Sequence, residues 1–145
     1  MAMGVVTDYY VLKNAMVAAN AGDAAKAATQ LAASATNLQT YLQKDSSVGI
    51  AALKPYTDTI IAQSKLTATL TDPTCEKQRA AFGPISSSLY SVLKTVEVKN
   101  SGIYHEYCPM AFNDKGATWL SAESEIKNPY FGKKMMECGE VTDSL

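Results

Sequence analysis

Apolar residues recur at alternating steps of three and four through most of the first hundred residues, a spacing typical of amphipathic helices. The first stripe predicts a helix that ends near Asn20, and its members are Val5, Tyr9, Leu12 and Met16. The second stripe predicts a helix of about five turns, and its members are Ala24, Ala28, Leu31, Ala35, Leu38 and Leu42. Small residues on it would let a neighbouring helix approach closely. Between the two helices, Gly22 predicts a left-handed stop and Asp23 predicts an N-cap.

Two further helices follow in the same pattern. Pro55 suits an early helical position, so a third helix is expected to begin there and to run to Leu70. Asp72 is predicted to cap a fourth helix, whose stripe comprises Cys75, Gln78, Phe82, Ile85, Leu89, Val92 and Val96. Pro84 interrupts this stripe and predicts a kink. Because short connections make consecutive helices antiparallel, the pattern predicts an up-down four-helix bundle.

The helical period stops after residues 99–102, and the rest of the chain carries a different pattern. Alternating residue types and turn residues predict a short hairpin over residues 103–120. Ser121 is predicted to cap a brief helical turn that runs through Ile126 and is terminated by Asn128 and Pro129. We therefore expect a mainly α fold in one domain, residues 5–145, with a helical bundle over 5–98 and a compact, irregular or hairpin tail over 99–145 packed on it.

Length and charge exclude several classes of function. The chain has 145 residues and a net charge of −1, which gives no cluster of cations for a nucleic acid. No stretch approaches the roughly 18 apolar residues of a transmembrane segment. A sole histidine lacks a nucleophile partner, and no phosphate-binding glycine loop or paired-carboxylate motif occurs. We assign no catalytic residue and do not expect an enzyme.

Sulfur side chains gather in the tail and indicate a soft-metal site. Cys108 and Met110 share one Cys-Pro-Met turn, which can aim two sulfur atoms at a common point. The second arm of the predicted site consists of Met135, Met136 and Cys138. His105 would add a nitrogen ligand. Thiolate and thioether favour copper(I) or silver(I), whereas zinc is less expected because the tail has no Cys-x-x-Cys and one histidine.

Six short segments of this chain resemble an uncharacterised bacterial domain associated with heavy-metal efflux. Four are in the tail, around Tyr104–Ala111, Trp119–Ser121, Ile126–Gly132 and Met135–Gly139, and the segments Tyr9–Ala15 and Gln78–Phe82 are also similar. That domain is mainly periplasmic and occurs alone or at the carboxy-terminal end of CusB-type efflux adaptors. The resemblance implies a periplasmic helical bundle that handles metal, with an efflux adaptor or another periplasmic metal-handling protein as partner. It places the family's sulfur positions at Cys108, Met110, Met136 or Met135, and Cys138.

The thiols leave other interpretations open. Cys108 and Cys138 could form a disulfide that ties an irregular tail, which would make the domain a structural or protein-interaction module. They could also be buried thiols without a special role, or alternate between a reduced metal-binding form and an oxidised one. Cys75 lies on a core stripe and is expected to be a small buried hydrophobe. Trp119, Tyr130 and Phe131 are expected to join the tail to the helices as an apolar plug.

Overall fold

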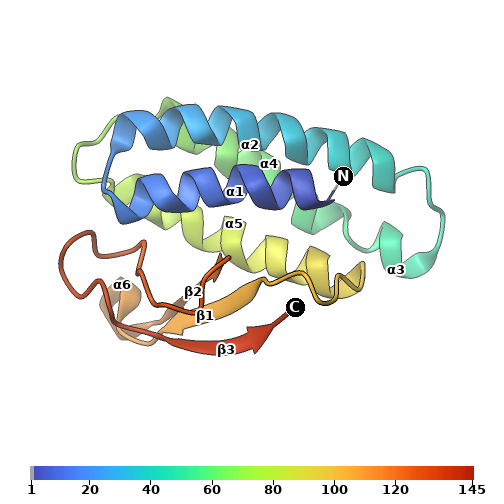
Figure 1. Cartoon of the computed structure of the whole chain (residues 1–145). Coiled ribbons are helices and arrows are strands. Elements are labelled where there is room, and N and C mark those ends of the chain that lie inside the picture. The colour runs from blue at the N-terminus through green and yellow to red at the C-terminus, as the bar shows by residue number, and fades with distance from the viewer. Residues whose placement is uncertain (1) are drawn as a thin grey trace.

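The computed structural model describes residues 2–145 and is mainly helical, with a small three-stranded antiparallel sheet near the carboxy terminus (Figure 1). Its helices are α1 (Ala2–Val17), α2 (Ala21–Leu42), α3 (Val48–Ala51), α4 (Lys54–Thr69), α5 (Glu76–Thr95) and α6 (Ala111–Asp114). Its strands are β1 (Tyr104–Cys108), β2 (Ala117–Ser121) and β3 (Glu140–Ser144). Within residues 2–145, no helix combines the length and the apolar character needed to cross a bilayer.

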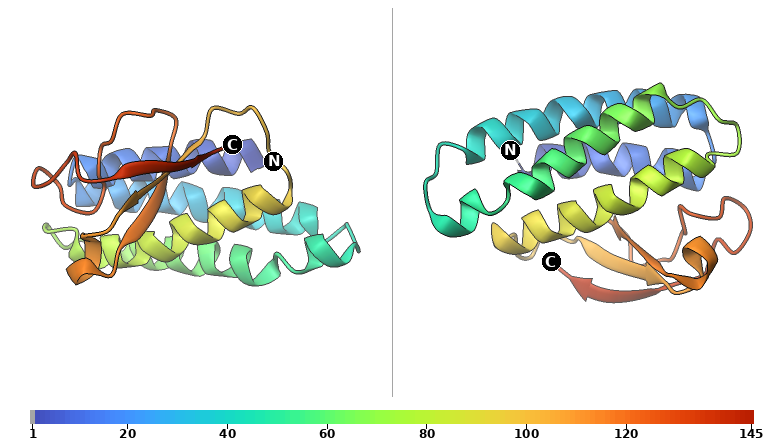
Figure 2. Two further views of the ribbon diagram at one scale, coloured as in Figure 1. Left: turned by 90° about the horizontal axis from the view of Figure 1, so that it is seen from below. Right: turned by 180° about the vertical axis from the view of Figure 1, so that it is seen from behind.

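The four long helices pack in chain order. α1 contacts α2, α2 contacts α4, and α4 contacts α5, while the sheet lies against α5 and α1 (Figures 1 and 2). The predicted stripe of α2 faces inward: Ala24, Ala28, Leu31 and Ala35 are fully buried. Because alanine adds little volume, the neighbouring helices come close to the backbone of α2 on both sides.

Two predicted helix starts are wrong in detail. Asn20, not Asp23, caps α2, because its side-chain oxygen accepts from the Asp23 N–H at 2.9 Å. The left-handed residue is Ala19, with φ of 54°, and Gly22 lies inside the helix. Asp72 does not cap α5 either. Its carboxylate accepts from the backbone and hydroxyl of Thr74, so the chain makes a turn first and the helix begins after Cys75.

Helix α5 continues through Pro84, the position at which the sequence predicts a kink. The clash that keeps a residue before proline out of the helical region involves that residue's Cβ, which Gly83 lacks. The short helix α3 was not predicted. Helix α4, in contrast, begins with Pro55 in its first turn as the sequence indicated.

The sheet has the order β2-β1-β3, with both pairs antiparallel. The predicted hairpin over residues 103–120 is confirmed as the β1–β2 pair, with α6 in its connection. The predicted helical turn after Ser121 is wrong: residues 122–125 form bends, and the Ser121 hydroxyl accepts from the Glu123 N–H at 3.1 Å. β3 was not predicted, because its five residues contain one apolar side chain, Val141.

Tyr9 on α1 joins the helices to the sheet. Its ring stacks on Phe82 of α5 with centroids 5.1 Å apart. Its hydroxyl lies 2.7 Å from the Ser86 hydroxyl and accepts from the Leu120 N–H of β2 at 3.0 Å. Trp119 and Tyr130 are buried in the same core, as expected of an apolar plug. The tail therefore shares a hydrophobic core with the helices.

Candidate functional site

Cys108 and Cys138, thirty residues apart in the chain, meet at the end of the sheet. Cys108 is the last residue of β1 and is fully buried, whereas Cys138 lies in the turn before β3 and is partly exposed. Their sulfur atoms are 2.7 Å apart. The structure thus brings the two arms of the predicted sulfur site together through one residue from each arm.

Asn128 and Gly139 hold the second arm in place. The buried Asn128 side chain donates to the Cys138 carbonyl at 2.8 Å, and its backbone N–H donates to the Met136 carbonyl at 2.7 Å. Gly139 has φ of +145°, and a Cβ there would lie 2.8 Å from the Trp119 ring. Since no larger residue fits that space, glycine after Cys138 lets the chain pass Trp119 and enter β3.

The methionines of the predicted site lie at its edge. Met110 directly precedes α6, and its backbone N–H faces the Cys138 sulfur, but its side chain is 46% exposed. Met135 is exposed and left-handed, with φ of 50°, while Met136 is partly buried. Residues 132–137 form turns and Cys138 follows them, so neither strand nor helix spacing selects between these two methionines.

His105 is not brought to the cysteine pair. It lies three positions from Cys108, on the other face of β1 by strand alternation. Its ring stacks on Tyr90 with centroids 3.9 Å apart, and its Nδ1 lies 2.6 Å from the Thr142 hydroxyl. Burial lowers its pKa. Cys75 is buried in the helical core, as predicted, and desolvation raises the pKa of its thiol.

Cys138 is not an activated thiolate. Hydrogen bonding to Cys108 and burial raise the pKa of Cys138, while the Met110 N–H lowers it. A thiol whose pKa is raised keeps its proton at neutral pH and is a weak nucleophile. Two chemical reactions remain open to such a pair: oxidation to a disulfide, or loss of protons to a thiophilic metal.

The spacing of the sulfur atoms limits how a metal could bind. Two thiolates on a tetrahedral zinc, with bonds of about 2.3 Å, stand about 3.8 Å apart. The observed 2.7 Å is shorter, so the side chains would have to separate before both could bind one ion. Across residues 2–145 no cluster of three or more His, Cys, Asp or Glu side chains is placed to hold a metal.

Glu106, which the sequence interpretation missed, is buried beside the pair on the same face of β1 as Cys108. Its Oε1 accepts from Trp119 Nε1 at 2.8 Å, and its Oε2 has no partner among the described residues. Desolvation raises its pKa to about 7, against the opposing effects of the Trp119 hydrogen bond and the Lys13 charge. The alternation of residue types over residues 103–107 was the sequence signal that could have placed Glu106 in the interior.

Taken together, fold and site define a mainly helical domain that carries a pair of cysteines on a small carboxy-terminal sheet. The chain belongs to the family described as Protein of unknown function (DUF3347), whose profile matches residues 5–101, about two thirds of the chain. The match covers the long helices and ends before Cys108. Neither the curated proteins nor the solved structures gave a match.

Proposed function

We propose that this domain binds a soft metal ion, copper(I) or silver(I), through Cys108 and Cys138 in their reduced form. The observation that carries the proposal is the meeting of the two sulfur atoms from arms thirty residues apart. Thiolate sulfur is the preferred ligand of copper(I), which is stable with only two such ligands in line. The resemblance of the tail blocks to a domain associated with heavy-metal efflux supports the same choice.

Binding requires the sulfur atoms to move apart, and the two arms differ in how freely they can move. Cys108 is fixed in β1, whereas Cys138 lies in a turn and is partly exposed. Rotation of the Cys138 side chain would open the pair to a metal ion. Met110 and Met135, both exposed nearby in the chain, are the candidates for a third, thioether ligand.

We further propose a periplasmic location and a partner that handles the same metal, such as an efflux-pump adaptor, on the family resemblance alone. The helical part is proposed to be the up-down four-helix bundle that the sequence indicates. Support comes from the pairwise packing of α1 on α2, α2 on α4 and α4 on α5.

A second candidate function is a structural or protein-interaction module whose tail is held by a Cys108–Cys138 disulfide. The 2.7 Å contact favours it, because the sulfur atoms are already closer than two metal-bound thiolates would be. Such a bridge would stabilise the fold by about 3–4 kcal/mol through the loop of roughly 30 residues that it closes.

Anaerobic titration of the reduced protein with copper(I), against a chromophoric chelator, tests the first function. We expect one copper ion per chain, with Cys108→Ser and Cys138→Ser each weakening binding by about 100-fold or more. Cys75→Ser is the matched control, since that thiol is buried in the helical core, and it should bind as the parent does. Failure of the reduced parent protein to compete with the chelator would exclude the metal function.

Alkylation in denaturant followed by mass measurement tests the second function. A permanent bridge leaves one modified thiol, that of Cys75, whereas a reduced pair leaves three. Under the second function, Cys138→Ser should lower stability and leave copper binding unchanged.

A further inference from the structure

The two segments that carry the sulfur pair are held in different ways. Cys108 ends β1, whose backbone pairs with the neighbouring strand on either side. Cys138 follows a run of turns, and from Lys133 to Glu137 no side chain is buried. The Cys138 N–H donates to the Met135 carbonyl at 3.0 Å, which is a bond within the same turns. The position of Cys138 opposite Cys108 therefore depends on contacts from outside these turns.

Asn128 supplies such contacts through its side chain and its backbone. Its Nδ2 donates to the Cys138 carbonyl at 2.8 Å, and its N–H donates to the Met136 carbonyl at 2.7 Å. These two bonds close residues 129–137 into a loop with Asn128 and Cys138 at its base. Because Asn128 is fully buried, opening the loop would leave its amide donor without a partner, and that carries a cost in free energy.

Asn128 is itself tied to the helices and the sheet. Its Oδ1 accepts from the Tyr130 N–H at 2.8 Å, which fixes the orientation of the amide. The Tyr130 hydroxyl donates to the Thr118 carbonyl of β2 at 2.6 Å. The Arg79 guanidinium of α5 donates through Nε to the Pro129 carbonyl at 3.2 Å. The amide is therefore a fixed point that holds the other end of the loop.

We propose that Asn128 is the positioning residue of the sulfur pair, and that its amide sets how often the Cys138 thiol meets the Cys108 thiol. This geometry governs two reactions. Oxidation joins the two sulfur atoms, and copper(I) binding, which rests on the proposed function, brings both sulfur atoms to one ion. Thiols that are held in place beforehand lose less freedom when they react, so the amide favours both reactions.

Equilibration of the metal-free protein with glutathione buffers measures the first reaction. The two thiols give two electrons and two protons to one glutathione disulfide, which leaves a protein disulfide and two glutathione thiols. Asn128→Ala removes the side-chain donor and should lower the equilibrium constant of this reaction about tenfold, which raises the midpoint potential by about 30 mV. Asn128→Asp keeps the acceptor for the Tyr130 N–H but loses the donor, and it should lower the constant at least as much.

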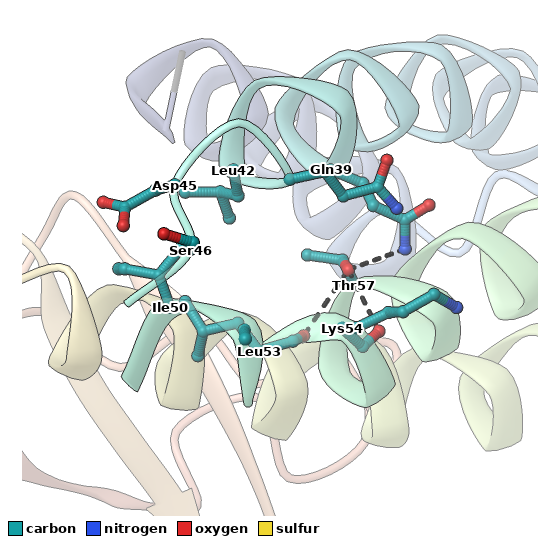
Figure 3. A pocket seen from close by; sticks show the side chains of 10 residues that line it. Gln39, Leu42, Asp45, Ser46, Ile50, Leu53, Lys54 and Thr57 are labelled. Carbon is teal, nitrogen blue, oxygen red and sulfur yellow. Dashed lines mark hydrogen bonds between the residues drawn. The ribbon is translucent and has the colours of Figure 1, made fainter. Parts of the chain in front are cut away.

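Gln39→Ala is the matched control, because it also removes an amide that makes two hydrogen bonds. Gln39 Nε2 donates to the Thr57 hydroxyl at 2.8 Å (Figure 3) and to Asp58 Oδ1 at 2.7 Å, and it thereby joins α2 to α4. These residues lie near α3, at the opposite end of the molecule from α6, which follows Cys108 in the chain (Figure 1). The variant should lose stability in urea, as Asn128→Ala does, and keep the equilibrium constant of the parent.

Copper(I) titration of the same variants against a chelator measures the second reaction. We expect Asn128→Ala to bind one ion about tenfold more weakly than the parent, and Gln39→Ala to bind as the parent does. An unchanged oxidation constant in both Asn128 variants would overturn the positioning role, as would an equal fall in Gln39→Ala.

Unchanged copper affinity in Asn128→Ala would overturn the part of this residue in metal binding and leave the proposed function standing. Absence of copper binding by the parent would reject the proposed function, and the glutathione constants would then decide the role of Asn128 by themselves.

Discussion

Among individual residues, Glu106 carries an unbalanced cost of burial in the interior. One carboxylate oxygen has a partner, Trp119 Nε1, and the other has none among the described residues. Lys13 of α1 and Glu123 act on it from a distance with opposite signs, and burial dominates both. Folding therefore favours the neutral, protonated carboxyl group.

The raised pKa of Glu106 predicts how stability depends on pH. The folded chain holds this proton up to about pH 7, whereas an unfolded glutamate loses it near pH 4.5. The contribution of Glu106 is thus fully present below pH 4.5 and is lost as the pH rises through 7. Glu106→Gln, which keeps the acceptor for Trp119, should be more stable than the parent at pH 8 by about 2–3 kcal/mol at most.

Urea unfolding of metal-free parent and variant at pH 5 and pH 8 measures this difference. The comparison cancels the contribution of His105, whose lowered pKa makes stability change with pH in the opposite direction. An equal pH dependence in the two proteins would contradict a neutral Glu106.

In the tail, the sequence predicted only those features that depend on the identity of the residues and their order along the chain. The Cys-Pro-Met turn and the second cysteine indicated a site of two arms, and Cys108 and Cys138 do meet. His105 lies away from the cysteine pair because side chains alternate between the two faces of β1. Asn128 holds Cys138 in place through a turn conformation that no sequence period specifies. The role of the methionines as metal ligands stays a prediction.

Among the elements, α2 depends most on small side chains. Its alanines pack against α1 on one side and α4 on the other. The three-four period predicted a helix with its stripe from Ala24 to Leu42, and α2 runs from Ala21 to Leu42, because a long amphipathic pattern leaves few alternatives. The helix ends were less predictable, since Asn20 and Asp23 are both good caps and the choice depends on where the preceding turn closes.

Ala28→Leu tests the close approach at α2. The added methylene groups have no space in this fully buried position, so we expect a loss of about 1–3 kcal/mol in the free energy of unfolding. Ala33→Leu, at an exposed position of the same helix, should change it by less than about 0.5 kcal/mol. Denaturant unfolding measures both, and equal effects would show that the interface is not tightly packed.

At the scale of the whole molecule, the helical layer and the sheet are joined through a few buried polar contacts. Tyr9→Phe keeps the stacking on Phe82 but leaves the Leu120 N–H without its acceptor. We expect a loss of about 1–3 kcal/mol. Amide hydrogen exchange should show faster opening at Leu120 and its neighbours in β2.

Tyr10→Phe is the control, because the buried Tyr10 hydroxyl has no partner within residues 2–145 and its removal should be neutral or stabilising. If the two variants lost the same stability, the Tyr9 hydroxyl would not be the link between helices and sheet. The sequence predicted a tail packed on helices but not this link, since nothing in a helical period marks which tyrosine reaches a neighbouring strand.

The unequal exposure of the two sulfur atoms sets the order of events at the pair. Cys108 is sealed within the sheet, and Cys138 alone reaches solvent. A donor protein, a small thiol or an oxidant must therefore meet Cys138 first, and Cys108 can take part only as the second partner in any exchange. Delivery and release at this pair would follow one route in reverse directions, with Cys138 as the entrance and Cys108 as the inner anchor.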